Sequence, residues 1–329
     1  MSKSIKAIVY QTHGKPAEVL RLEERPLPSP GPDEAIVRVK AAPINPADLN
    51  QIEGKYPVRP VLPATPGFEG AGVIEELGSA VKGHAIEEMV ILPHDVGTWR
   101  QAVAVKAEKL IRVPDGIPAE QAAMLKINPI TAWRLLHDFV ALRPGDWVIQ
   151  NAANSGVGQA VIAICRDLGF RTVNVVRRKE LMNGLRAHGA DVVLLDNDEL
   201  REAVPQATGG AAIRLAINQV GGDSALRLAK VIAPEAVVVT IGAMSLQPLC
   251  LPNGLLIFKN LHFTGFWVNK WYDQATPEHR TETFERIFDM AQRGLLNVAI
   301  ERTYALERFQ EAVDRASAGK RSGKILFQM

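Results

Sequence analysis

The sequence contains little cysteine, few aromatic residues and no long hydrophobic run. Its two cysteines, Cys165 and Cys250, are too few for a disulfide framework, and we expect both to be inert thiols in a protein core. No apolar stretch reaches the roughly 18 residues that a membrane-spanning helix needs. The net charge of only +2 gives no reason to expect nucleic acid or an anionic membrane as a partner.

What remains is the composition of a soluble globular protein, with 47% hydrophobic and 22% charged residues in a chain of 329. That length accommodates two domains of ordinary size. The N-terminal residues 1–10 pass directly into a strand-like alternation and lack the apolar core of a signal peptide. We therefore expect a cytoplasmic protein in which both thiols stay reduced.

Short apolar runs separated by proline and glycine turns fill residues 1–125. Examples are the runs at 35–40, 70–75 and 89–92. Frequent strands without intervening helices predict a β-rich domain over this part of the chain.

The pattern then changes to apolar strands that alternate with helices. A strand from Trp147 to Gln150 runs into a turn of small residues, and apolar residues then recur with a helical period up to Leu168. Nearly continuous apolar strands separated by helices predict a doubly wound parallel sheet, and hence an α/β protein. Further strands of this sheet are predicted at 171–176, 191–195, 214–218, 236–240 and 261–265.

The turn between the first of these strands and its helix has the pattern of a dinucleotide site. Ala153, Gly156 and Gly158 let the backbone approach a pyrophosphate, whose charge is stabilised by the N–H groups at the start of the helix. A tight turn without a ligand is the alternative interpretation. The complete order of strand, turn, helix and second strand favours the nucleotide.

The residues after the second strand distinguish between two cofactors. Sites for NAD place Asp or Glu about 20 residues beyond the glycine turn, where it binds the ribose 2′-hydroxyl. Here Arg177, Arg178 and Lys179 occupy that place, and the first acid is Glu180. Three cations suit a 2′-phosphate, so the sequence predicts NADPH. The alternative is an ordinary solvated run of charges.

A β-rich domain, a doubly wound domain and a C-terminal return segment, in this order, resemble the medium-chain dehydrogenase/reductase superfamily. The resemblance implies a GroES-like catalytic domain over 1–125, completed by 268–329, and a Rossmann NADPH-binding domain over 126–267. The return segment is predicted to contain helices at 282–294 and 306–318 and a strand at 324–327.

Local motifs within this frame are similar to the enoyl-thioester reductases of mitochondrial fatty-acid synthesis. The Asn-Ser-Gly-Val-Gly turn at 154–158, the Asn-Pro-Ile-Thr-Ala segment at 128–132 and the pair Phe266 and Trp267 are together fairly specific. The glycine turn alone would also suit the quinone oxidoreductases of the same superfamily.

Zinc is not expected. A catalytic zinc needs about three protein ligands from cysteine, histidine or carboxylate around one open position. In zinc-dependent members of the superfamily a Gly-His-Glu motif follows a catalytic cysteine. In this chain Gly67-Phe68-Glu69 stands in place of that motif, and residues 44–48 stand in place of the cysteine segment. Glu69 and Asp48 are therefore predicted to be structural hydrogen-bonding groups.

Without a metal, conjugate reduction of an α,β-unsaturated carbonyl is the reaction that fits. NADPH gives hydride to the β-carbon, charge builds on the carbonyl oxygen, and the α-carbon takes a proton, which a tyrosine hydroxyl can donate. The chain has four tyrosines, and Tyr56 matches the catalytic tyrosine of the family. The alternative is a tyrosine that anchors its loop beside Pro57 and Pro60.

The resemblance also implies cofactor contacts, position by position. Asn128 matches an asparagine whose amide meets the cofactor, and Lys324 matches a basic residue near it. The glycine turn, the basic triplet and the loops after two parallel strands supply the others. These predicted contacts are Asn154, Ser155, Gly156 and Val157; Arg177, Arg178 and Lys179; Ile241, Gly242, Ala243 and Met244; and Phe266, Trp267 and Val268.

Two positions depart from the pattern of the family. Ile241 stands where a tyrosine is frequent, and Lys126 stands where glycine is usual. Lys126 is expected to bring a cation close to the cofactor or to the entry of the acyl chain.

The leading hypothesis is an NADPH-dependent reductase of 2-enoyl thioesters carried by CoA or by acyl-carrier protein. An NADPH:quinone or enone oxidoreductase is the alternative among enzymes, and an NADPH-binding sensor or structural protein is the alternative outside them. The strand at 261–265 is expected at an edge of the sheet, where a second copy would cover it, so we predict a homodimer. Neither nucleic acid nor membrane is expected to bind.

Overall fold

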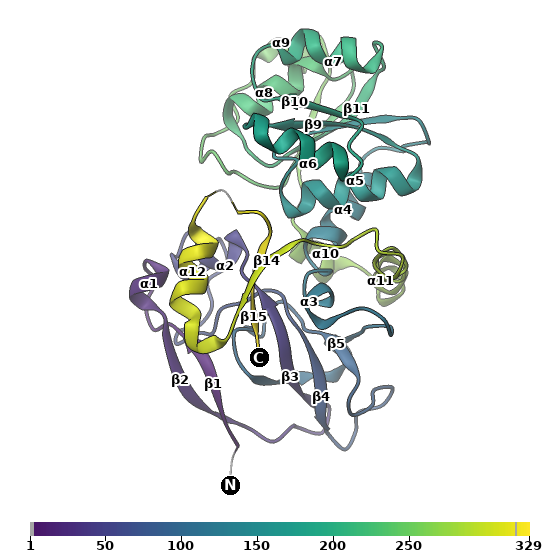
Figure 1. Ribbon diagram of the computed structural model, residues 1–329. Coiled ribbons are helices and arrows are strands. Elements are labelled where there is room, and N and C mark those ends of the chain that lie inside the picture. The colour runs from purple at the N-terminus through teal and green to yellow at the C-terminus, as the bar shows by residue number, and fades with distance from the viewer. Residues whose placement is uncertain (1–2, 320) are drawn as a thin grey trace. The chain divides into compact units, whose positions relative to one another are not determined.

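The computed structural model describes residues 3–319 and 321–329, and it separates into two compact units. Unit 1 consists of Met1–Ile127 and Phe288–Met329, and unit 2 is the continuous segment Asn128–Ile287. Figure 1 labels many of the helices and strands of both units. Each unit has its own sheets and its own hydrophobic core.

Unit 1 is mostly β-structure. Its strands are β1 (Lys3–Val9), β2 (Arg21–Leu27), β3 (Glu34–Pro43), β4 (Ala71–Leu77), β5 (Met89–Ile91), β6 (Ala102–Lys106), β7 (Ile111–Arg112), β14 (Ile300–Tyr304) and β15 (Lys324–Gln328). The main sheet runs in the order β14-β15-β3-β4-β5-β7, with β6 antiparallel to β3, and β1 and β2 form a separate antiparallel pair. Because β15 pairs with β3, the C-terminal segment completes a sheet that N-terminal strands begin.

The core of unit 1 likewise needs both ends of the chain. The helices of this unit are α1 (Pro16–Val19), α2 (Pro46–Ile52), α3 (Ala119–Ala122) and α12 (Phe309–Ser317), with the 3-10 turns η1 (Ala107–Lys109) and η3 (Leu306–Arg308). Phe309 and Val313 on the buried face of α12 share one core with Ile325 and Phe327 of β15. The ring of Trp99 meets that of Phe327 edge-on, with the centroids 5.1 Å apart.

Unit 2 contains one parallel sheet. Its strands are β8 (Trp147–Gln150), β9 (Arg171–Val176), β10 (Val192–Leu195), β11 (Ile213–Asn218), β12 (Val237–Thr240) and β13 (His262–Gly265). They are ordered β10-β9-β8-β11-β12-β13, so the winding direction reverses between β8 and β11. Such sheets bind ligands beyond the carboxyl ends of their strands. The predicted doubly wound sheet is confirmed, and β13 lies at its edge as predicted.

Helices cover both faces of this sheet. They are α4 (Asn128–His137), α5 (Gly156–Leu168), α6 (Met182–Ala187), α7 (Leu200–Thr208), α8 (Gly222–Val231), α9 (Asn253–Ile257), α10 (Val268–Gln274) and α11 (Pro277–Gln292), with the 3-10 turn η2 (Lys179–Leu181). Figure 1 shows α5 and α6 on one side of the sheet and α7 and α8 on the other. Helix α5 begins after its N-cap Ser155 and ends at Gly169, whose left-handed backbone has a φ of 73°.

The chain returns to unit 1 at Phe288, later than residue 268, where the sequence places the return. Helix α10 and most of α11 stay with unit 2, where Arg134 of α4 reaches both helices. Its guanidinium carbon lies 5.7 Å from the centroid of the Trp271 ring, and its Nη1 lies 2.5 Å from Nε2 of His279.

The two cysteines differ in burial. Cys165 is buried on α5 as predicted, but the prediction that Cys250 lies in a core is wrong. Cys250 is exposed because it belongs to the irregular segment between β12 and α9, in which Leu246 and Leu249 are exposed as well.

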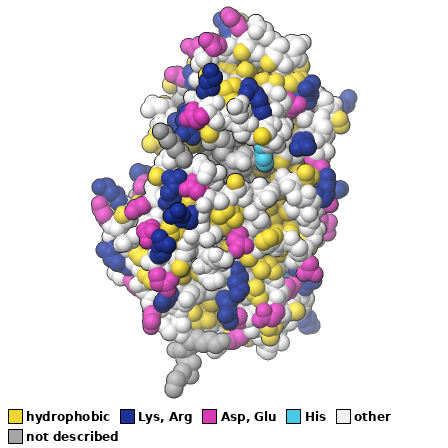
Figure 2. Space-filling model, in the orientation of Figure 1, with side chains coloured by type: hydrophobic (Ala, Val, Ile, Leu, Met, Phe, Trp, Pro, Cys, Tyr) yellow, Lys and Arg dark blue, Asp and Glu magenta, His cyan; other side chains and the backbone are white. Residues whose placement is uncertain are grey.

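The surface carries both signs of charge. Figure 2 shows basic and acidic side chains interspersed over the face in view. Within residues 3–319 and 321–329, no helix is both long and apolar enough to cross a bilayer.

Candidate active site

The glycine turn of unit 2 joins the carboxyl end of β8 to α5. The hydroxyl of Ser155 accepts a hydrogen bond of 3.0 Å from the backbone N–H of Gly158. A side chain at residue 158 would bring its Cβ within 2.4 Å of the carbonyl oxygen of Ala153, so the tight turn requires glycine there. The other N–H groups in the first turn of this 13-residue helix can receive an anion.

Asn128, the first residue of α4, lies directly against this turn. A Cβ at residue 156 would come within 2.8 Å of Nδ2 of Asn128, so Gly156 makes room for the amide. The same Nδ2 atom is buried and has no hydrogen-bond partner among the described residues. A buried amide without a partner is costly, and a ligand oxygen would satisfy it. The turn and Asn128 therefore fit a dinucleotide.

A network of buried amides, which the sequence did not reveal, holds the turn in place. The hydroxyl of Ser155 donates to Oε1 of Gln219 over 2.7 Å, and Nε2 of Gln219 donates to the carbonyl of Asn151 over 3.1 Å. The Asn151 side chain accepts from the backbone N–H of Gln219 over 2.7 Å. The Gln219 carbonyl accepts from the N–H of Met244 over 3.2 Å. Gln219 thus joins the turn to the loop after β12, and only its place directly after a predicted strand marks it in the sequence.

The basic triplet follows β9, the strand that pairs with β8 beside the glycine turn. Arg177 and Lys179 are exposed, and Arg178 is half-buried with a contact of 3.7 Å to Glu180. Asn154 is exposed within the turn itself. The cations can therefore contact a ligand at the carboxyl ends of the strands, where the turn also lies.

Two more predicted loops lie at the carboxyl ends of strands in the same sheet. Residues 241–244 follow β12 and become more exposed toward Met244, whereas residues 266–268 follow β13. Phe266 packs edge-on against Phe139, with the ring centroids 6.0 Å apart, Trp267 is 40% exposed, and Val268 is buried. The structure thus gathers the predicted contacts of unit 2 along the carboxyl ends of one sheet.

Tyr56 belongs to unit 1, in the loop after α2, and is half-buried. Its ring packs against the ring of Phe68 at 46°, with the centroids 5.2 Å apart. Its backbone N–H donates to the carbonyl of Asn50 over 3.1 Å. Phe68, which stands in place of the histidine of the Gly-His-Glu motif, thus packs against the tyrosine ring.

A buried polar cluster fixes the segments that carry Tyr56 and Phe68. Asp48 of α2 accepts hydrogen bonds from the backbone N–H groups of Asn45 and Phe68, at 2.6 and 2.9 Å. The Asn45 amide donates to Glu69 over 2.8 Å and accepts from Lys324 Nζ over 2.5 Å. Asp48 and Glu69 are fully buried, and their predicted role as structural hydrogen-bonding groups is confirmed.

Burial also sets the protonation of this cluster. It raises the pKa of Asp48 to about 7, although two backbone N–H groups oppose the shift. It raises the pKa of Glu69 and lowers that of Lys324, and the attraction between these two charges opposes both shifts. Lys324 therefore lies with the acids of unit 1, and its role at the cofactor stays a prediction.

Lys126 is directed into unit 1. Its side chain is 2% exposed, and its Nζ donates to the carbonyl of Leu92 over 2.9 Å. Burial lowers the pKa of Lys126 to about 7, against the attraction of Glu69. Lys126 is thus an interior group of unit 1, and its closeness to the cofactor or to the acyl entry stays a prediction.

Both units match known families. Residues 31–115 match the alcohol dehydrogenase GroES-like domain, and residues 156–291 match the zinc-binding dehydrogenase family. The mitochondrial enoyl-[acyl-carrier-protein] reductase of Xenopus tropicalis is 41% identical over 95% of this chain and 92% of its own length. The human protein of the same name is 39% identical over 99% of this chain and 89% of its own.

The chain belongs to the medium-chain dehydrogenase/reductase superfamily.

Solved structures of this superfamily agree with the fold. A mitochondrial 2-enoyl thioester reductase heterodimer from Candida tropicalis gives a TM-score of 0.89 at 30% identity, covering 99% of this chain and all of that one. A structure from Bacillus thuringiensis, described as an NADPH:quinone reductase, gives 0.93 at 30% identity and covers 100% of both chains. The predicted combination of a GroES-like and a Rossmann domain is confirmed.

The prediction of a cytoplasmic protein is wrong. The enoyl reductases similar to this medium-chain reductase are named as mitochondrial enzymes, in animals as in Arabidopsis thaliana. The prediction rested on the first few residues alone, and those residues say nothing about where the folded domains work.

One of the two families that this medium-chain reductase matches is described as zinc-binding. Within the part of the chain that the structure describes, no three side chains of His, Cys, Asp or Glu are grouped to hold a metal ion. The metal independence of the protein stays a prediction.

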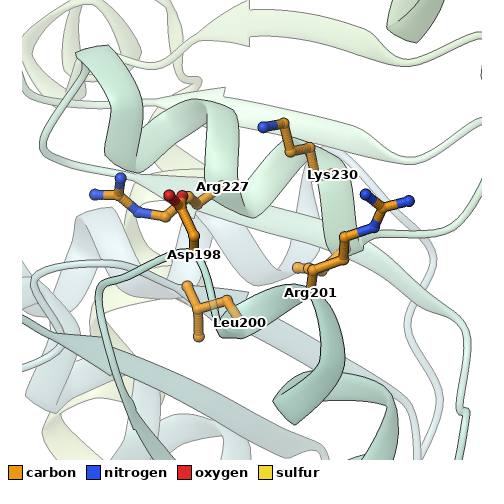
Figure 3. A pocket seen from close by; sticks show the side chains of 6 residues that line it. Asp198, Leu200, Arg201, Arg227 and Lys230 are labelled. Carbon is orange, nitrogen blue, oxygen red and sulfur yellow. The ribbon is translucent and has the colours of Figure 1, made fainter.

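A hollow of about 250 Å³ in unit 2 lies apart from these groups, between α7 and α8. Figure 3 shows the carboxylate of Asp198 turned toward Arg227, with Arg201 and Lys230 farther along the rim. Arg227 also pairs with Asp196 over 2.7 Å. No residue of the glycine turn lines the hollow, so we do not assign it to the active site.

Proposed function

We propose that this protein reduces the carbon–carbon double bond of 2-enoyl thioesters with NADPH. The observation that carries the proposal is the contact between Tyr56, which has a hydroxyl donor, and Phe68. Phe68 stands at the position where zinc-dependent members of the superfamily have a metal ligand. The curated relatives are named for this reaction, and one similar solved structure is a reductase complex with NADP and crotonyl-CoA.

The groups of unit 2 would hold NADPH. The N–H groups in the first turn of α5 suit the pyrophosphate, and Nδ2 of Asn128 supplies a donor that has no partner within the described protein. Arg177, Arg178 and Lys179 suit the 2′-phosphate through charge-assisted hydrogen bonds, whereas a carboxylate at their place would repel it. The loops at 241–244 and 266–268 would border the nicotinamide.

The chemistry divides between cofactor and protein. When bound, NADPH supplies the hydride that the β-carbon of the enoyl group receives. The hydroxyl of Tyr56 holds the proton for the α-carbon, so that one hydride and one proton saturate the double bond, and water restores the tyrosine. Phe68 keeps the ring of Tyr56 in place for this transfer.

Quinone reduction is the second candidate, favoured by the likeness to the Bacillus thuringiensis structure. A quinone accepts its electrons at a flat apolar ring and does not need a donor positioned at a carbon atom. Tyr56 would then serve only as a loop anchor.

Rates of NADPH oxidation separate the two candidates. We expect turnover with crotonyl, hexenoyl and decenoyl thioesters and at least about 100-fold lower kcat/KM with a simple quinone, since only the enoyl substrate uses the proton donor. A higher kcat/KM with the quinone would contradict the proposal. NADPH binding without turnover of either substrate would indicate a sensor or structural protein.

We further propose that the protein is a homodimer joined at the edge of the sheet in unit 2. Strand β13 has a neighbour on one side only, and Leu246, Ile257 and Phe258 in the segment before it are 85%, 68% and 88% exposed. Unpaired edges and exposed apolar patches are commonly covered by a partner. Light scattering should give twice the mass of one chain for the natural sequence. The variant Phe258→Asp should give the mass of a single chain. The control Val61→Asp, at an exposed apolar residue of unit 1, should leave the dimer intact.

A further inference from the structure

Unit 1 contains a groove that takes no part in the candidate active site. It has a volume of about 390 Å³ and lies between the β1–β2 pair and β6. Its apolar lining includes Ile5, Leu27, Ala102 and Ala104, which belong to a small hydrophobic cluster of their own. The volume is within the range of sites for small ligands.

Two guanidinium groups, those of Arg25 and Arg100, line the same groove. Arg100 is partly buried and is placed by a backbone bridge with Ala7, and its Nε donates to the carbonyl of Gly97 over 2.8 Å. Burial, followed by repulsion from Arg25, lowers the pKa of Arg100 to about 10. No acidic side chain among the described residues compensates this charge.

Arg25 also has a hydrogen-bond donor without a partner. It lies opposite Ile5 in the β1–β2 pair, and its Nη2 pairs with Glu23 over 2.6 Å. Its Nε is buried and has no hydrogen-bond partner among the described residues. Glu23 pairs with Arg25, so the partly buried charge of Arg100 has no carboxylate partner among the described residues, whereas charges withdrawn from water are normally paired. An anion in the groove would complete the pairing.

We propose that this groove binds the carboxylate of an alkyl acid, with Arg25 and Arg100 at the carboxylate and the apolar wall along the chain. The planar guanidinium group matches the geometry of a carboxylate, and two of them can receive both oxygen atoms. A bare inorganic anion would leave the partly buried Ile5 and Ala104 in contact with water. A free fatty acid satisfies the charges and the apolar wall together.

Calorimetric titration of decanoate into the intact protein tests the proposal. We expect one molecule bound per chain, and binding of decanol at least about tenfold weaker because it lacks the charge. Arg25→Met should weaken decanoate binding at least about tenfold, since it removes charge-assisted hydrogen bonds while keeping an apolar side chain. Ala104→Leu should weaken it too, by filling the groove without changing any charge.

The matched control is Arg38→Met, which removes an exposed strand arginine of the same unit that also pairs with a glutamate, Glu75. It should bind decanoate like the natural sequence. Equal binding of decanol, or full affinity in both Arg25→Met and Ala104→Leu, would overturn the proposal. So would loss of the decanoate signal on saturation with NADP⁺ and crotonyl-CoA, because the acid would then occupy the enoyl site. Competition by inorganic phosphate alone would indicate an anion site without the alkyl specificity, which also contradicts it.

Discussion

Two buried polar clusters of this reductase, one at the glycine turn of unit 2 and one around Asp48 in unit 1, are organised in opposite ways. At the glycine turn of unit 2 the groups that hold one another are neutral, as in the bond between Ser155 and Gln219. Unit 1 instead buries charges, because Asp48 and Glu69 have no exposed surface and Lys126 is 2% exposed. Neutral hydrogen bonds keep their geometry over a wide range of pH, whereas buried ionisable groups couple structure to protonation.

The contrast between neutral and ionisable buried groups agrees with the functions that we propose for the two units. Unit 2 would hold a cofactor through fixed dipoles and exposed cations, and unit 1 would supply the proton. Changes in unit 2 should therefore appear in the KM for NADPH, and changes in unit 1 should appear in kcat and in the dependence on pH. The following experiments test whether the effects on the KM for NADPH and on kcat divide between the units in this way.

The largest effect is expected for Tyr56→Phe, which removes the proton donor but keeps the ring against Phe68. The kcat for crotonyl-CoA should fall by about 100-fold or more, as loss of a general acid usually causes, with little change in the KM for NADPH. Steady-state kinetics measures both. If the Phe variant keeps full turnover and only Tyr56→Ala is impaired, Tyr56 anchors its loop and unit 1 does not supply the proton.

The next effect concerns the basic triplet of unit 2. Replacing Arg177 and Arg178 by Ala should raise the KM for NADPH at least tenfold and leave that for NADH nearly unchanged. The reason is that each charge-assisted hydrogen bond contributes about 1.5–3 kcal/mol. The control removes two cations elsewhere in unit 2, by Arg201→Ala with Lys230→Ala. An equal effect in the control would mean that overall charge, rather than a phosphate site, governs affinity.

A smaller effect is expected for Gln219→Met, which keeps the size of the side chain but breaks its bonds to Ser155 and Asn151. The KM for NADPH should rise about threefold to tenfold, because a neutral hydrogen bond contributes about 0.5–1.5 kcal/mol. The increase should be the same at pH 6 and pH 9. Gln206→Met, at an exposed position of α7, is the matched control. A change in kcat alone would contradict the expectation that changes in unit 2 affect the KM for NADPH.

The buried lysine of unit 1 should make stability depend on pH. The pKa of Lys126 is about 7 in the folded protein against its usual 10.5, so between these values the unfolded chain binds more protons. The free energy of unfolding should therefore rise with pH in this window, by at most about 1.4 kcal/mol per pH unit. In Lys126→Met this contribution should vanish. Denaturant unfolding at pH 7, 8 and 9 measures it, and parallel curves for both proteins would contradict it.

No effect at all is expected from removal of metal. Dialysis against a strong chelator should leave activity intact, and elemental analysis should find less than one zinc per chain. Activity that is lost to the chelator and restored by Zn²⁺ would show that the replacement of a ligand by Phe68 was misinterpreted.

The parallel sheet could be predicted from the sequence because its signals are local. The apolar run of β8, the glycine turn and the helical period of α5 follow one another within residues 147–168, and Ser155 caps the helix where the turn predicts it. An apolar run does not say which way it faces, however. Cys250, between two leucines, was predicted in a core and is exposed.

The buried cluster of unit 1 could not be predicted, because its partners are far apart in the chain. Lys324 and Asn45 are separated by 279 positions, and no periodicity connects them. Gln219 was missed for a similar reason, since its bond to Ser155 spans 64 positions. Tyr56 was found through its resemblance to a family motif, whereas its packing on Phe68 became visible only in the fold.

The central claim, that hydride goes to the β-carbon and a proton to the α-carbon of an enoyl thioester, can be tested on the product itself. Crotonyl-CoA is incubated with the enzyme and NADPH deuterated at C4 of the nicotinamide, in ordinary water, and the product is analysed by NMR and mass spectrometry. We predict butyryl-CoA with one deuterium at C3 and a hydrogen from solvent at C2. Deuterium at C2, or no butyryl-CoA while a quinone is reduced under the same conditions, would contradict the account.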